Sequence, residues 1–102
     1  MPHVDPRLNR HLRDANSEML IDAIFIILEP HQNPLEIWED NGFAKQIIQQ
    51  IIQETNEEPS FLRFISRANA VALTAHPKFI NTLLTHSCVK VASSATIDPF
   101  HF

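Results

Sequence analysis

The stretch NAVALTAHPKFINTLL, residues 69–84, decides the fold, because the spacing of its apolar residues changes in the middle. Residues 70–75 alternate small and larger side chains, as a strand does. After His76-Pro77, the apolar residues of FINTLL follow the spacing of one helix face, and the proline suits a first helical turn. The stretch therefore predicts a strand that leads directly into a short helix over residues 77–86.

The rest of the chain supplies further strand and helix patterns. MLIDAIFIIL, residues 19–28, is apolar on both faces except at Asp22, which is typical of a strand in the middle of a sheet. We expect Asp22 to be the one position of this strand that faces solvent. In chain order, the predicted elements are a short helix from Pro6, a strand at 19–28, a helix at 43–55, two strands paired as a hairpin around 66–68, a helix at 77–86 and a strand at 88–96.

This order of strand, helix, strand, strand, helix and strand is the ferredoxin-like βαββαβ arrangement of the α+β class. Right-handed crossovers then place both main helices on one face of a four-stranded antiparallel sheet and leave the other face open. The 102 residues suit one domain: residues 1–17 are an N-terminal extension with the short helix, 18–96 the domain and 97–102 a tail. The apolar patterns predict one shared core that contains Ile24, Ile26, Ile47, Ile51, Phe79 and Leu83.

Composition excludes several classes of protein. The single cysteine, Cys88, cannot form an internal disulfide, and Cys-rich metal sites are excluded with it. The net charge of -4 argues against nucleic acid as a partner. No apolar run approaches the roughly 18 residues of a membrane span, and the opening of the chain has no apolar signal-peptide core. We therefore expect no membrane partner and a cytoplasmic protein, or a secreted one if the chain is a trimmed precursor.

Residues that could carry chemistry are scattered along the chain. The six histidines show no metal-ligand spacing. Cys88 opens a predicted strand, so a buried structural thiol is favoured over a nucleophile. Phe61, Arg63 and Phe64 could form an aromatic and basic surface for nucleic acid, but core packing of the two phenylalanines is favoured. The sequence therefore predicts no catalytic residue, no metal site, no cofactor and no enzymatic activity.

Three separate pieces of the chain resemble the propeptide, or inhibitor, domain of subtilisin-like serine proteases. VDPRLNRHLRDANSEMLIDAIFIIL, residues 4–28, is similar to the opening of such domains, with Asp-Pro, a short Leu-rich helix and a strand. NAVALTAHPKFINTLLTHSCVKV, residues 69–91, resembles the family's most recurrent part, a small-residue strand followed by a helix and a strand of alternating valines. SSATIDPFHF, residues 93–102, resembles the family's extended C-terminal segment, whereas the EPHQNPLEIWEDNG loop, residues 29–42, is longer than is usual.

The resemblance implies a free-standing inhibitor of a subtilisin-like serine protease, which would also act as a chaperone for the folding of that protease. In this family the open sheet face lies against two surface helices of the protease, and the C-terminal segment runs along the substrate cleft. Strand-like pairing and side-chain pockets hold such a segment. The residues expected to form this protease-binding tail are Ile97, Asp98, Pro99, Phe100, His101 and Phe102.

A second hypothesis is a ferredoxin-like structural module that dimerises through its open sheet face without inhibiting a protease. Phe61, Leu62, Phe64 and Ile65 lie close together in the sequence, and exposed apolar patches mark association sites. The chain is accordingly expected to be a monomer or a weak homodimer. Measurements of molecular size in solution and of protease inhibition distinguish the two hypotheses.

Overall fold

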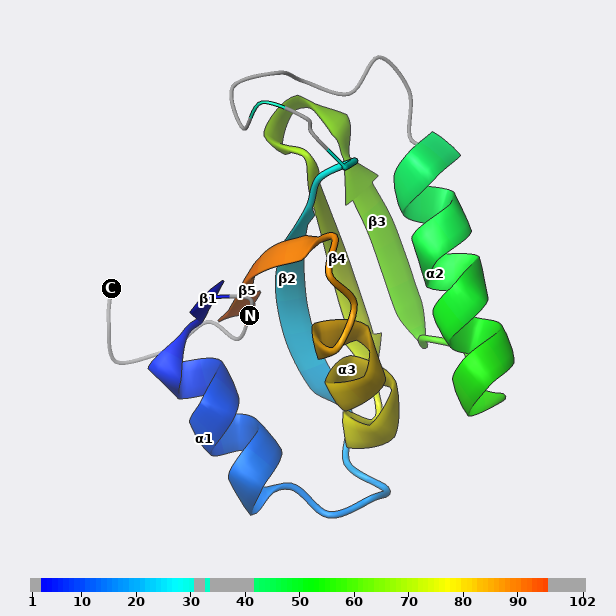
Figure 1. Cartoon of the computed structure of the whole chain (residues 1–102). Helices are drawn as coiled ribbons and strands as arrows, with labels where there is room; N and C mark the ends of the chain where they lie inside the picture. Colours follow the sequence, from blue (N-terminus) through cyan, green and yellow to red (C-terminus); the bar gives the residue numbers. More distant parts are fainter. Residues whose placement is uncertain (1–2, 31–32, 34–41, 96–102) are drawn as a thin grey trace.

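Within residues 3–30, 33 and 42–95, which the computed structural model describes, a mixed five-stranded sheet is accompanied by three α-helices (Figure 1). The α+β class predicted from the sequence is therefore confirmed. In chain order, the elements are β1 (His3–Val4), α1 (Pro6–Asp14), β2 (Ile21–Ile27), α2 (Gly42–Thr55), β3 (Phe61–Ile65), the 3-10 turn η1 (Ser66–Ala68), β4 (Ala70–Ala75), α3 (Pro77–Leu84) and β5 (Val89–Ser94).

The strands lie in the order β1-β5-β2-β4-β3. Strands β5, β2, β4 and β3 pair antiparallel, whereas β1 runs parallel to β5 and places Val4 opposite Ala92. The prediction of a four-stranded, wholly antiparallel sheet is therefore wrong. The added strand is only two residues long, too short for an alternating pattern to show in the sequence. The backbone N–H of Asp5 extends its pairing by donating to the carbonyl of Ala92 at 2.8 Å.

The strand and helix predicted from residues 69–84 are both present. β4 ends at Ala75, and α3 begins two residues later at Pro77, whose ring fits the first helical turn. β3 and β4 form the predicted antiparallel hairpin around η1, and Asn69 closes the turn with a φ of 51°. That angle lies in the left-handed region, which asparagine tolerates better than most residues.

Helix α1 is joined to the rest of the molecule by its cap and by its apolar side. The carboxylate of Asp5 accepts the backbone N–H of Arg7 at 3.0 Å, and Pro6 occupies the first turn. Leu8 is fully buried in the main core, and Leu12 packs against that core. The N-terminal helix is therefore part of the hydrophobic core.

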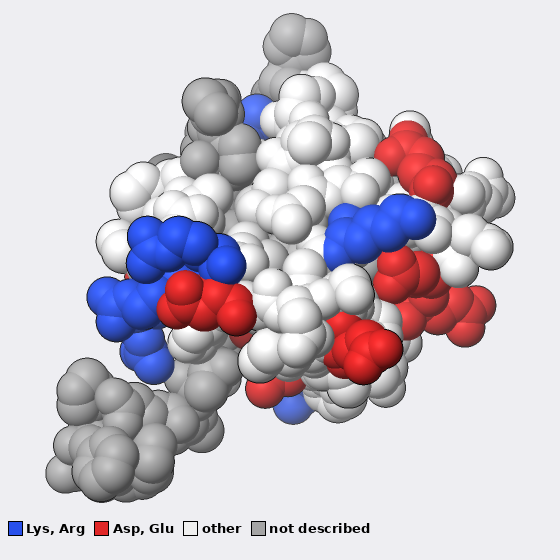
Figure 2. Space-filling model, turned by 90° about the horizontal axis from the view of Figure 1, so that it is seen from below, with Lys and Arg blue, Asp and Glu red and all other residues white. Residues whose placement is uncertain are grey.

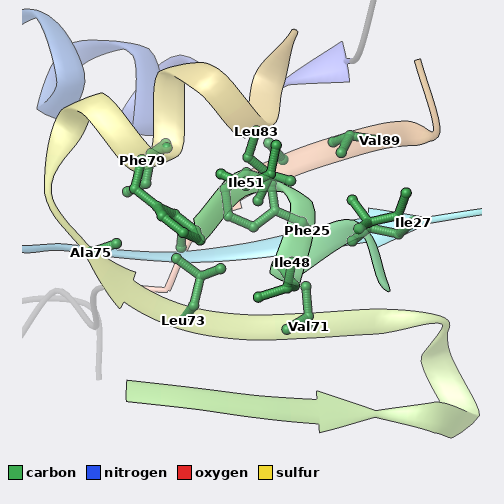
Figure 3. Packing of buried hydrophobic residues seen from close by; sticks show 14 of the residues in the cluster. Phe25, Ile27, Ile48, Ile51, Val71, Leu73, Ala75, Phe79, Leu83 and Val89 are labelled. Carbon is green, nitrogen blue, oxygen red and sulfur yellow. The ribbon is translucent and has the colours of Figure 1, made fainter. Parts of the chain in front are cut away.

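One hydrophobic core lies between the helices and one face of the sheet. Figure 3 shows Phe25, Phe79, Ile51 and Leu83 meeting on one side of β2 and β4. Burial of this apolar surface is the main term that favours the folded state. The core cluster contains Leu8, Ile21, Ala23, Phe25, Ile27, Ile47, Ile48, Ile51, Val71, Leu73, Ala75, Phe79, Ile80, Leu83, Cys88, Val89 and Ala92.

The predicted core is correct for the helices and wrong for β2. Its four helix residues, Ile47, Ile51, Phe79 and Leu83, are buried together. Ile24 and Ile26 lie outside this cluster, because they alternate with Phe25 and a strand directs successive side chains to opposite faces. Asp22 is exposed, as predicted, and it lies on the same face as the two isoleucines.

Candidate functional site

The face of the sheet that points away from the helices is the surface best suited to binding. Residues opposite one another on neighbouring strands project to the same face, so the register defines this surface strand by strand. Large buried side chains of α1, α2 and α3 belong to the core on the other face, so no described helix covers it. We call this surface the open face and define it by His3, Asp22, Ile24, Ile26, Phe61, Arg63, Ile65, Ala72, Thr74, Val91 and Ser93.

The open face is largely apolar. Ile24 and Ile26 lie at its centre on β2, with Val91 beside Ile26 on β5. All three side chains are partly buried by their neighbours, and Ile65 on β3 is as well. A sheet with one face in water normally presents polar side chains there. An apolar surface in that position is typical of an interaction site.

The two phenylalanines of β3 lie on opposite faces of the sheet. They are three residues apart, and an odd separation in a strand directs two side chains to opposite sides. Phe61 is on the open face and is 53% exposed, so the core packing predicted for it is wrong. Phe64 points to the helices and packs against the core, as predicted. The sequence spacing alone could have shown that only one of them can be buried there.

The open face carries one acidic and one basic side chain, Asp22 and Arg63. Within the described residues neither of them forms an ion pair. The hydroxyl of Thr74 donates a hydrogen bond to the carboxylate of Asp22. A shallow hollow of about 180 Å³ lies beside this pair, and its lining includes Phe61 and Ala95. The open face therefore combines an apolar centre with a polar hollow at one end.

The residues predicted to bind a protease, Ile97 to Phe102, lie outside the described residues. The described chain that leads to them reaches Ala95, whose backbone N–H donates to the carbonyl of Asp22 at 3.1 Å. Ala95 also lines the hollow beside the side chain of Asp22. Ala95, the last described residue before the tail, therefore lies at the edge of the open face, next to the hollow.

Histidine side chains lie within hydrogen-bond distance of other groups of the chain. His86 Nδ1 accepts the backbone N–H of Cys88 at 3.2 Å, and His11 Nδ1 lies 3.4 Å from the hydroxyl of Ser94. Cys88 is buried, as predicted. In the part of the chain that the structure describes, no group of three His, Cys, Asp or Glu side chains is placed to hold a metal ion.

A larger hollow of about 690 Å³ lies where α3 ends, between that helix and strands β1 and β5. Val4, Leu84 and Val89 contribute apolar lining. The ammonium group of Lys90 already donates to the carbonyl of Ser87 at 2.9 Å. The side chains of Thr85 and His86, which also line the hollow, each take part in a local hydrogen bond as well.

Most charge visible at the lower end of the molecule lies to either side of an uncharged surface (Figure 2). Basic side chains gather over α1 with an acidic group beside them, and acidic side chains gather on the side where α2 ends, with a basic group between them. The sequence places Arg7, Arg10 and Arg13 on α1, and Glu54, Glu57 and Glu58 at the end of α2.

Comparison with models of protein families, with curated proteins and with solved structures gave no match. Among the described residues, no helix has both the length and the apolar character needed to cross a membrane. The geometry of the open face and the sequence of the tail are therefore the features of this chain that bear on its function.

Proposed function

We propose that this protein inhibits a subtilisin-like serine protease by laying the open face against the protease and the tail, residues 97–102, in the substrate cleft. The observation that carries this proposal is the apolar centre of the open face at Ile24 and Ile26. Interfaces between proteases and inhibitors have an apolar centre surrounded by a polar rim. Asp22 and Arg63 supply charged groups around the apolar centre of the open face.

The connectivity of the sheet supports the same proposal. Four of the five described strands lie side by side in the order β5-β2-β4-β3 and pair antiparallel. Along the chain, α2 connects β2 to β3, and α3 connects β4 to β5. This connectivity fits a ferredoxin-like βαββαβ unit, to which β1 and α1 are added next to β5. Because one fold hosts many functions, the proposal rests on the open face and the tail rather than on the fold.

The inhibitor performs no chemistry in this mechanism. The tail lies extended in the cleft, where main-chain hydrogen bonds hold its backbone and the primary pocket takes Phe100 or Phe102. The hydrogen bond from the backbone N–H of Ala95 to the carbonyl of Asp22 holds the residue two positions before the tail beside the open face. Two linked contact regions bind more tightly than either alone, because the second contact forms at high effective concentration.

The same contacts would assist the folding of the protease. A protein that binds the folded protease and not its unfolded chain shifts the folding equilibrium towards the folded state. The chaperone activity and the inhibition therefore have one physical origin, and a variant that weakens one should weaken the other.

A charge at the centre of the open face should weaken inhibition. Ile24→Lys places an ammonium group in the apolar centre, where contact with the protease would remove it from water at a cost in free energy. We expect inhibition to weaken at least ~10-fold, which is about 1.4 kcal/mol. The measurement is a titration of a subtilisin-like protease that follows hydrolysis of a chromogenic peptide.

Gln50→Lys is the matched control, because it adds the same charge on the exposed side of α2. It should leave inhibition unchanged, and thermal unfolding of both variants checks that each is folded. If Ile24→Lys inhibits as well as the wild type, the open face does not contact the protease. If the wild type inhibits none of a panel of subtilisin-like proteases, the proposed function is wrong.

A further inference from the structure

The hollow at the edge of the open face has the chemistry of a site for a guanidinium group. Asp22 lines the hollow, and its carboxylate accepts a hydrogen bond from the hydroxyl of Thr74, which restricts its orientation. Phe61 lines the same hollow with about half of its side chain exposed. A carboxylate beside an aromatic ring suits arginine, which can pair with the first and stack on the second.

The open face also carries an arginine that fits such a site. Arg63 is exposed on β3, opposite Ala72, and it forms no ion pair within the described residues. Asp22 lies two strands away, opposite Thr74. From standard strand spacing and rise, roughly 12 Å separates the Cα atoms of Asp22 and Arg63. Extended arginine and aspartate side chains can meet across that distance, but within the described residues Arg63 and Asp22 form no ion pair.

A second copy of the chain can offer each of these side chains an opposite charge. A two-fold axis that lies along the open face, passes midway between Asp22 and Arg63 and is perpendicular to the line joining them places each residue opposite the other residue of the second copy. Such a dimer makes the pair twice, as an isologous interface does. We propose that the chain forms this two-fold dimer, open face to open face, with Arg63 of each copy in the hollow beside Asp22 of the other.

The apolar centre and the two charge pairs have different roles in this dimer. Ile24 and Ile26 lie on the surfaces brought together, and their burial supplies most of the affinity. Each charge pair sets the register, because a shifted arrangement leaves Asp22 and Arg63 against apolar groups without a counter-charge. The dimer is therefore specific in orientation although its centre is made of aliphatic side chains.

Self-association would hide the surface that the protease is proposed to bind. A dimer and a complex with the protease cannot form through the same face at once, so dimerisation would lower the fraction of active inhibitor at high concentration. This competition rests on the proposed function, whereas the dimer itself does not. Sedimentation of the protein alone tests the dimer without any protease present.

Exchange of the two charges tests the pairing. Sedimentation equilibrium of the full chain should show a concentration-dependent dimer for the wild type. Asp22→Arg or Arg63→Asp alone should raise the dissociation constant at least ~10-fold, because each places like charges together. The double variant, Asp22→Arg with Arg63→Asp, recreates both pairs with reversed sign and should return the dissociation constant to within about threefold of the wild type.

Three outcomes would overturn this proposal. The wild type could remain monomeric up to the highest concentration at which it stays in solution. The single variants could dimerise as well as the wild type, which would place the interface elsewhere. The double variant could stay as weak as the single variants although its circular dichroism and thermal midpoint match the wild type, which would exclude the pairing of Asp22 with Arg63.

Discussion

Replacing Phe25 by alanine should lower the free energy of unfolding by about 3–5 kcal/mol, the usual cost of deleting a buried aromatic side chain. Phe25 has no exposed surface and lies on the helix side of β2, in contact with the core that α2 and α3 form. The loss combines the lost burial of the ring with the cavity it leaves behind. Urea unfolding followed by circular dichroism measures the change directly.

Ile24→Ala is the matched control, because Ile24 is the adjacent residue of the same strand and points to the open face. Its side chain is only partly buried, so the loss should stay below about 1.5 kcal/mol. Equal losses for the two variants, or a larger loss for Ile24→Ala, would mean that the faces of β2 are assigned the wrong way round.

Strand β2 shows how far an apolar pattern can be interpreted. A sequence with aliphatic or aromatic residues on both faces identifies a central strand but does not say which face meets the helices. Asp22 supplies the missing information, because residues separated by two in a strand share a face. Ile24 and Ile26 follow Asp22 at even spacing, so its exposure indicates that they lie on the open face.

The elements predicted from longer patterns are present, and the one that was missed has no pattern to detect. β1 is two residues long and exists because Val4 and its neighbour pair with β5 at the edge of the sheet, a contact between distant parts of the chain. The open face could be expected from the topology alone. The hollow at its edge could not, because it depends on the register that brings Asp22, Phe61 and Ala95 together.

Deleting residues 97–102 should weaken inhibition at least ~100-fold, which is about 2.7 kcal/mol. Interfaces between proteases and inhibitors concentrate their binding energy in a few side chains that fill pockets. Phe100 and Phe102 are the candidates in this tail, and we favour Phe102 as the residue in the primary pocket. Titration of the protease with full-length and truncated protein measures the change.

The same deletion should leave the thermal midpoint within a few degrees of the full-length value. β5 ends at Ser94, before the deleted residues, so the truncated chain keeps the pairing of all five strands described. A truncated protein that inhibits as strongly as the full chain would show that the tail is not the inhibitory element. Single variants Phe100→Ala and Phe102→Ala then identify the anchoring side chain if truncation does abolish inhibition.

The central claim is that the open face contacts the protease, and methyl NMR tests it most directly. The protein, labelled at its isoleucine methyl groups and diluted until it is monomeric, is titrated with a catalytically inactive subtilisin-like protease. The account predicts that the signals of Ile24, Ile26 and Ile65 shift or broaden at substoichiometric protease. The signals of Ile48, Ile51 and Ile80, which are buried in the core, should change much less. Changes confined to isoleucines outside the open face, or no change at saturating protease, would contradict it.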